Sequence, residues 1–209
     1  MDIYNFYVFA LTGLILNLTP GNDMIYVASR STGQGIKAGI ISALGIMGGC
    51  FLHIVAAVIG LSAIISQSAV AFDIIKYLGA SYLIYLGFRA LFNKKKTLAI
   101  TRMPETASYE KIFWQGVITN VLNPKVALFF LAFLPQFINI NAEDTHRQIL
   151  FLGTWFNISG TIVNILVAIL FGKIGNWLSN SPRFMQWQER ITGMVLIGLG
   201  IKMALTKPS

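Results

Sequence analysis

Six long apolar segments divide this chain of 209 residues, and each is long enough to cross a bilayer as a helix. A spanning helix needs about 20 mostly apolar residues. Only 11% of the residues are charged, whereas a soluble domain has about a quarter. The sequence predicts an all-α polytopic membrane protein with one transmembrane domain over residues 1–209. The six segments are roughly 3–27, 38–65, 70–92, 113–136, 148–172 and 189–206.

A near-copied stretch of seven residues closes each half of the chain. Leu83 to Arg89 reads LIYLGFR, and Leu196 to Lys202 reads LIGLGIK. Each copy ends a run of three apolar segments, and an odd number of spans gives the two halves opposite orientations. We therefore predict six transmembrane helices as two inverted three-helix repeats, 1–92 and 112–209, joined by a cytoplasmic linker over 93–111. This is a plan of secondary transporters, which bind substrate where the halves meet.

The lysines and arginines predict the orientation, because cytoplasmic loops are enriched in them. Eleven follow the first, third and fifth segments, and four lie on the other side, so both termini should face outward. The net charge of +8 then reflects loops near anionic lipid headgroups rather than nucleic acid. The eleven are Arg30, Lys37, Arg89, Lys94, Lys95, Lys96, Arg102, Lys111, Lys173, Arg183 and Arg190, and the four are Lys76, Arg147, Lys202 and Lys207.

A helix break with an acid beside it is predicted in the first segment, at Asn17, Pro20, Gly21 and Asp23. Proline removes a backbone donor and clashes with a carbonyl one turn earlier, so the chain should leave the helix there. The freed carbonyls could accept hydrogen bonds from an ammonium, and the next half-helix would direct its amides at a carboxylate. The alternatives are an interfacial aspartate and a kink that only shapes the helix.

A second break with different chemistry is predicted in the fourth segment, at Asn120, Asn123, Pro124 and Lys125. Lys125 would lie near the middle of the bilayer, where charged side chains are rare and usually functional. It could pair with Asp23 across the two halves, or it could receive a substrate carboxylate. A structural ion pair without ligand contact is the alternative.

Other polar residues within spans are weaker candidates. His53 could relay protons, although a lone histidine on an apolar helix is more often bonded to a carbonyl. Tyr82 and Tyr85 fit a cavity wall and an aromatic belt about equally well. Three residues of the fifth span, Asn157, Thr161 and Asn164, share one helix face that should meet other helices or water. Small residues of the second span at Gly35, Gly39, Ala43, Gly45 and Gly49 predict close helix packing.

Enzymatic chemistry finds little support. The sequence has no phosphate-binding glycine-lysine loop, no His-Glu-x-x-His motif, and only one cysteine and two histidines to hold a metal. We therefore predict no cofactor, no metal site and no enzyme activity, and transport driven by an ion gradient. Export of another small solute such as a drug or a metal cation, a membrane enzyme and an assembly subunit are the alternatives. The sequence leaves a homodimer open.

Three motifs in order resemble the LysE/RhtB family of amino-acid exporters. They are Asn17 to Met24 (NLTPGNDM), Gly79 to Gly87 (GASYLIYLG), and Asn120 to Lys125 (NVLNPK) continuing to Phe137. The family commonly has proline at the position of Asn22. The resemblance covers nearly the whole chain. It implies efflux of neutral amino acids or derivatives, homoserine- or threonine-like, across the bacterial inner membrane in exchange for protons. In that membrane, the outward-facing termini predicted from the basic residues would lie in the periplasm.

Overall fold

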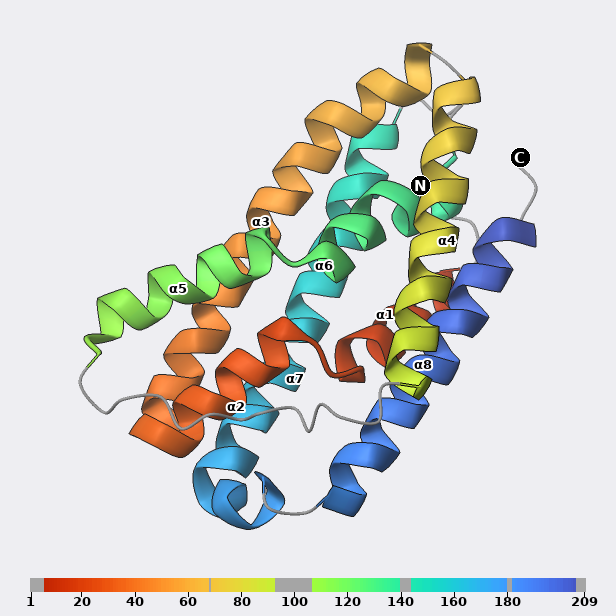
Figure 1. Ribbon diagram of the computed structural model, residues 1–209. Helices are drawn as coiled ribbons and strands as arrows, with labels where there is room; N and C mark the ends of the chain where they lie inside the picture. The colour runs from red at the N-terminus through yellow and green to blue at the C-terminus, as the bar shows by residue number, and fades with distance from the viewer. Residues whose placement is uncertain (1–5, 68, 93–106, 140–143, 180–181, 206–209) are drawn as a thin grey trace.

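The computed structural model describes residues 6–67, 69–92, 107–139, 144–179 and 182–205, and every element in this part of the chain is helical (Figure 1). The two longest helices are α3 and α7, and short helical pieces surround their middle. The elements are α1 (Phe6–Leu18), α2 (Asn22–Gln34), α3 (Ile36–Gln67), α4 (Ala69–Phe92), α5 (Tyr109–Val121), α6 (Pro124–Leu128), the π-helix η1 (Phe129–Phe133), the 3₁₀-helix η2 (Leu134–Phe137), α7 (Thr145–Ser179) and α8 (Pro182–Leu205).

All six expected segments are helical, and two of them are broken. The first segment is split between α1 and α2, and the fourth is split between α5 and the run from α6 to η2. The third and sixth fall within α4 and α8. The prediction of an all-α protein is confirmed. Helix α5 begins at Tyr109, inside the predicted linker over 93–111, and residues 93–106 lie outside the described residues.

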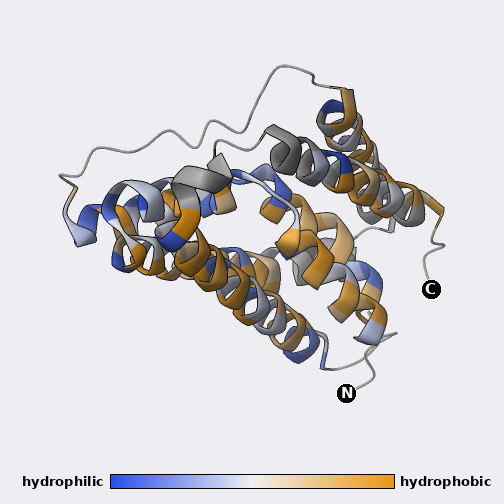
Figure 2. Ribbon diagram, turned by 90° about the horizontal axis from the view of Figure 1, so that it is seen from below, coloured by the Kyte–Doolittle hydropathy of each residue, from blue (hydrophilic) through white to orange (hydrophobic). Residues whose placement is uncertain are grey.

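Two described helices are long and apolar enough to cross a membrane, over Ile36–Gly60 and Thr145–Ile174. A third span results if the pair Tyr109–Val121 and Pro124–Phe137, bent by 46°, crosses as one unit. Hydrophobic residues run along most of the ribbon (Figure 2), and many large ones point outward, such as Ile59 and Leu166. Such an outer surface suits lipid. The six-span count stays a prediction.

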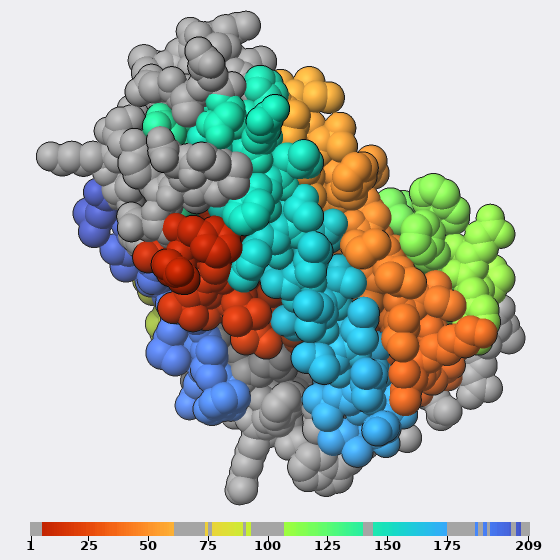
Figure 3. All heavy atoms as spheres, turned by 180° about the vertical axis from the view of Figure 1, so that it is seen from behind, coloured from red at the N-terminus to blue at the C-terminus, as the bar shows by residue number. Residues whose placement is uncertain are grey.

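The central helices α3 and α7 run in opposite directions against each other. A side chain built at Gly39, early in α3, would meet Ala168 late in α7, and one at Gly153, early in α7, would meet Ile54 late in α3. In the view from behind, α7 crosses the face of the molecule between α1 and α3 (Figure 3). The corresponding long helices of the two halves are therefore antiparallel neighbours.

The near-copied segments lie in α4 and α8, which pack side by side (Figure 1). Their contacts are reciprocal. In the two copies, Gly87 aligns with Gly200, and Ile84 aligns with Ile197. A Cβ built at Gly87 would lie 2.6 Å from Cγ1 of Ile197. A Cβ built at Gly200 would lie 2.6 Å from Cγ1 of Ile84. A twofold axis between antiparallel helices produces this exchange. It supports our prediction of two inverted repeats.

Close packing of α3 on α5 explains Gly45 and Gly49 of the second apolar segment. A Cβ on Gly49 would lie 2.6 Å from the carbonyl oxygen of Val117, and one on Gly116 would lie 2.7 Å from that of Ser42. Gly45 meets the carbonyl of Phe113 even more closely. Backbones that approach this closely need small residues, so the predicted packing role is confirmed for this pair. The packing role predicted for Gly35 is wrong, because Gly35 ends α2 with a φ of 85° and nothing lies within 4 Å of a Cβ built on it.

We expect Gly200→Ala to destabilise the protein and Gly198→Ala to stabilise it. The added methyl of Gly200→Ala would also lie 2.8 Å from the carbonyl oxygen of Ala80, and overpacking costs about 1–3 kcal/mol. Gly198 has open space around its Cβ, so alanine there gains about 0.5–1 kcal/mol of helix stability. Thermal unfolding of the two purified variants checks this, and equal shifts in unfolding temperature would contradict the α4 to α8 packing.

Candidate functional site

The first helix break falls where the sequence predicted it. Helix α1 ends at Leu18 and α2 begins at Asn22. Gly21, the residue just before α2, has an extended backbone (φ −163°, ψ −172°). Gly21 is the N-cap residue of α2 and makes no side-chain cap bond. Two half-helices therefore present opposite partial charges at this point, carbonyls from α1 and amides from α2.

The second break separates α5 from α6 at Leu122 and Asn123. Pro124 stands at the start of α6, where its missing amide hydrogen is not needed, and the Asn123 side chain accepts a hydrogen bond from the Lys125 amide at 3.0 Å. Because α6 begins here, Lys125 lies in the first turn of this half-helix, and its side chain extends from that turn. The break thus fixes where the cation points.

Lys125 joins the two breaks. Its ammonium Nζ donates to the carbonyl oxygens of Leu16 at 3.2 Å and Thr19 at 2.9 Å, at the carboxyl end of α1. A Cβ placed on Gly21 would lie 3.2 Å from the same ammonium. A cation at a helix carboxyl end is electrostatically favourable. The carbonyls that we expected to be free are held by Lys125 itself.

Asp23 occupies the first turn of α2 and is 8% exposed. Its Oδ2 accepts a hydrogen bond of 2.8 Å from Nδ2 of Asn120, which comes from α5 in the other half of the chain. Its Oδ1 is buried without a hydrogen-bond partner. A carboxylate at a helix amino end is favoured by the helix dipole. This carboxylate therefore lies inside the protein and not on its outer surface.

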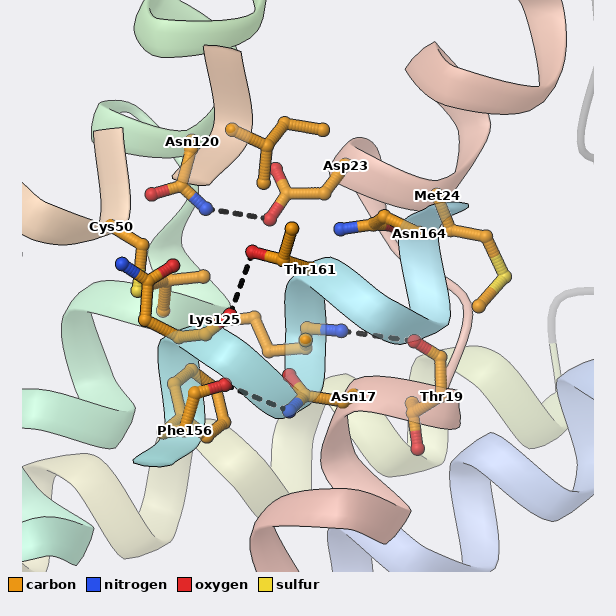
Figure 4. Close-up of a pocket in the computed structure, with 14 residues that line it drawn as sticks. Asn17, Thr19, Asp23, Met24, Cys50, Asn120, Lys125, Phe156, Thr161 and Asn164 are labelled. Atoms are coloured by element: carbon orange, nitrogen blue, oxygen red, sulfur yellow. Dashed lines mark hydrogen bonds between the residues drawn. The ribbon is translucent and has the colours of Figure 1, made fainter. Parts of the chain in front are cut away.

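Both charges line one narrow pocket between the breaks and α7 (Figure 4). Its volume for water is about 30 Å³, which is room for one or two water molecules and too little for an amino acid. The lining residues are Asn17, Thr19, Asp23, Met24, Ile46, Cys50, Asn120, Lys125, Val126, Phe156, Asn157, Gly160, Thr161 and Asn164.

Four of the eight candidate site residues line this pocket, namely Asn17, Asp23, Asn120 and Lys125. The others, Pro20, Gly21, Asn123 and Pro124, form the breaks that bring those four together. Asn17 donates through Nδ2 to the Ser159 hydroxyl at 3.0 Å and to the Phe156 carbonyl at 3.2 Å. The contact between the two breaks runs through Lys125.

The polar face of α7 forms the wall opposite the breaks. Asn157, Thr161 and Asn164 all line the pocket, so the prediction that they share one face that meets helices or water is confirmed. Asn157 donates to the Met47 carbonyl at 3.2 Å, and the Thr161 hydroxyl donates to the Asn157 carbonyl at 2.7 Å. The spacing found this face, but it gave no reason to rank it with the two breaks.

The weaker candidates have local partners. His53 contacts the Asn120 carbonyl through Nε2 at 3.2 Å and stacks on Phe130, which is the structural role expected of a lone histidine. Tyr82 and Tyr85 have ring centroids 6.0 Å apart, and Tyr85 is largely exposed. Neither tyrosine is part of the pocket lining.

Arg30 was counted from the sequence as a loop charge, and this was wrong. It lies in α2 and is 3% exposed. Its guanidinium donates to Oε1 of Gln34 at 2.7 Å and to Oε1 of Gln115 at 2.6 Å, and it lies 5.7 Å from the ring of Tyr26. The bond to Gln115 ties α2 to α5. Without Arg30, ten basic residues are still assigned to the cytoplasmic side and four to the other side, so the predicted orientation is unchanged.

The described residues contain no group of histidine, cysteine and acidic side chains that could hold a metal ion. What the fold and the pocket define is a helical membrane protein with two broken helices around a buried, charged pocket. A family model described as "LysE type translocator" matches residues 14–207. The chain therefore belongs to the LysE type translocator family, a family of membrane transporters and not of enzymes.

The relatives extend over nearly the full length. The chain is 33% identical to the uncharacterized membrane protein YrhP of Bacillus subtilis, over 90% of this chain and 93% of that protein. It is 30% identical to an uncharacterized membrane protein of Vibrio cholerae, over 99% of this chain and all of that protein. It is 24% identical to the leucine efflux protein of Salmonella typhimurium, over 97% of this chain and 95% of that protein. No solved structure shows significant similarity.

Proposed function

We propose that this protein exports neutral amino acids or their derivatives across the bacterial inner membrane in exchange for protons. Homoserine- and threonine-like substrates are one candidate class, from the sequence resemblance. Leucine-like substrates are another, because one relative is named a leucine efflux protein. The apolar side chains of Ile46, Cys50 and Val126 on one side of the pocket suit an aliphatic substrate.

The observation that carries this proposal is the pair of opposite charges in one buried pocket, Asp23 from α2 and Lys125 from α6. Each charge is held by neutral groups, Asp23 by the Asn120 amide and Lys125 by backbone carbonyls. An amino acid carries the complementary charges. Its ammonium would bind at Asp23, and its carboxylate at Lys125 and the uncapped amino end of α2.

Coupling to protons would use the same carboxylate. Asp23 can hold a proton or a substrate ammonium, and loading one on each side of the membrane would link the two fluxes. The pocket is too small for an amino acid in this structure, so binding requires the half-helices to move apart. The two breaks provide the hinges, since residues between half-helices absorb the change in backbone angles.

Orientation completes the proposal. The remaining bias of lysine and arginine toward the loops after the first, third and fifth segments supports termini in the periplasm. The residues 1–92 and 112–209 would then be the two inverted repeats, with lipid around them. A homodimer stays compatible with this arrangement.

Inverted membrane vesicles from overexpressing cells provide the test. We expect proton-gradient-dependent accumulation of a labelled neutral amino acid, threonine or leucine, that vesicles lacking the protein do not show and an uncoupler abolishes. In such vesicles a C-terminal tag should be protected from protease, because the periplasmic side lies inside. Accumulation that survives the uncoupler would contradict proton coupling, and the absence of transport for a full panel of neutral amino acids would contradict the substrate class.

A further inference from the structure

Asn164 presents its side-chain amide to the pocket. It is 8% exposed, it lies on the pocket face of α7, and no hydrogen bond to it is found among the described residues. Its neighbours on that face differ. Asn157 donates to the Met47 carbonyl at 3.2 Å, and Thr161 donates within its own helix at 2.7 Å. The Asn164 side chain points into the same space as Asp23 (Figure 4).

The Asn164 amide is not among the fully buried side-chain atoms that lack a partner, so water in the pocket can reach it. A pocket-facing amide without a protein partner is free to bind water or a ligand. The pocket has room for one or two waters, which can bind Asn164 while the site is empty. A ligand that enters the pocket displaces this water and must replace its hydrogen bonds.

The geometry points to Asn164 as a further binding residue: its amide, drawn in Figure 4 with the nitrogen toward Asp23, turns over so that the carbonyl oxygen receives the substrate's ammonium group together with Asp23. This inference rests on the proposed function and deepens it, because it adds a residue of α7 to a site otherwise built from the two breaks. An ammonium has three donors, and one carboxylate satisfies only part of them. A neutral acceptor on the opposite wall completes the shell without adding a second negative charge to the pocket.

The consequence for specificity is that the site recognises a primary ammonium. Lys125 and the amino end of α2 serve the carboxylate. A ligand with only the ammonium should therefore depend on Asn164, and a ligand with only the carboxylate should not. Isoamylamine and 4-methylpentanoate are such fragments of leucine.

The first measurement is thermal unfolding of the purified empty protein. Asn164→Leu removes an amide that bonds only to water in the empty pocket, so we expect the unfolding temperature to stay within about 2 °C of the wild type. The matched control is Asn157→Leu on the same face, which loses a hydrogen bond and should lower that temperature. A fall for Asn164→Leu like that of the control would show a structural role and overturn the inference.

The second measurement is displacement of a labelled substrate from the purified protein by each fragment. In Asn164→Leu we expect isoamylamine to bind about 10- to 100-fold more weakly, which is the usual worth of a hydrogen bond to a charged group, and 4-methylpentanoate to bind unchanged. Equal binding of isoamylamine by wild type and variant, or weakening of the carboxylate alone, would overturn the assignment. Failure of the wild type to bind any amino acid would instead overturn the proposed function, and the inference with it.

Discussion

Asp23→Asn should reach the membrane in normal amount and lose at least about ten-fold in export. Asparagine keeps the shape and the oxygen that accepts from Asn120, so the 2.8 Å bond between α2 and α5 can persist. What disappears is the negative charge that binds the substrate ammonium and exchanges with protons. A hydrogen bond to a charged group contributes about 1.5–3 kcal/mol, and each 1.4 kcal/mol is ten-fold in binding.

The effect on stability should have the opposite sign or be absent. Asp23 is 8% exposed and its Oδ1 has no hydrogen-bond partner, so removal of its charge relieves a buried group that is poorly satisfied. Initial export rates in inverted vesicles and the unfolding temperature of purified protein measure the two effects. The control is Glu110→Gln, an exposed acid in the first turn of α5. Wild-type export by Asp23→Asn at equal expression would refute the role of this carboxylate.

The helix breaks were predictable because they depend on local chemistry. Pro20 and Pro124 each lack a backbone donor, and no partner from elsewhere in the chain can replace it. The approach of α3 to α5 was predictable for a similar reason, since only small residues at Gly45 and Gly49 permit it. The duplication predicted which helices correspond, and the reciprocal contacts of Gly87 and Gly200 agree with it.

The partners of the buried charges were not predictable from the sequence. Lys125 binds carbonyls of residues more than 100 positions earlier in the chain, so its choice between Asp23 and the end of α1 depends on how the halves meet. Arg30 follows a polar turn pattern and looked like a loop residue, yet Gln115 from the other half covers it. Asn164 fitted an ordinary helix-packing stripe, and only its missing partner sets it apart.

Lys125→Met should lose export and also destabilise the protein. Methionine keeps the length of the side chain and removes the ammonium, so the carbonyls of Leu16 and Thr19 lose their donor at the end of α1. A buried acceptor without a partner costs about 1–3 kcal/mol. Asp23 loses its nearby opposite charge at the same time. The control is Lys111→Met, an exposed lysine of α5, which should change neither export nor stability.

The double variant Asp23→Asn with Lys125→Met separates charge compensation from independent roles. Each single change leaves one charge in a pocket without its opposite, and an uncompensated buried charge is more costly than a missing pair. The larger cost falls on Lys125→Met, because the Lys125 ammonium keeps its carbonyl partners in Asp23→Asn whereas Asp23 Oδ1 has no other partner. We therefore expect the double variant to be less destabilised than Lys125→Met alone, by about 1 kcal/mol or more. Additive effects on the free energy of unfolding would mean that Lys125 acts only through the carbonyls at the end of α1. Export should stay absent in the double variant, because restored neutrality gives the pocket no group to bind the two charges of an amino acid.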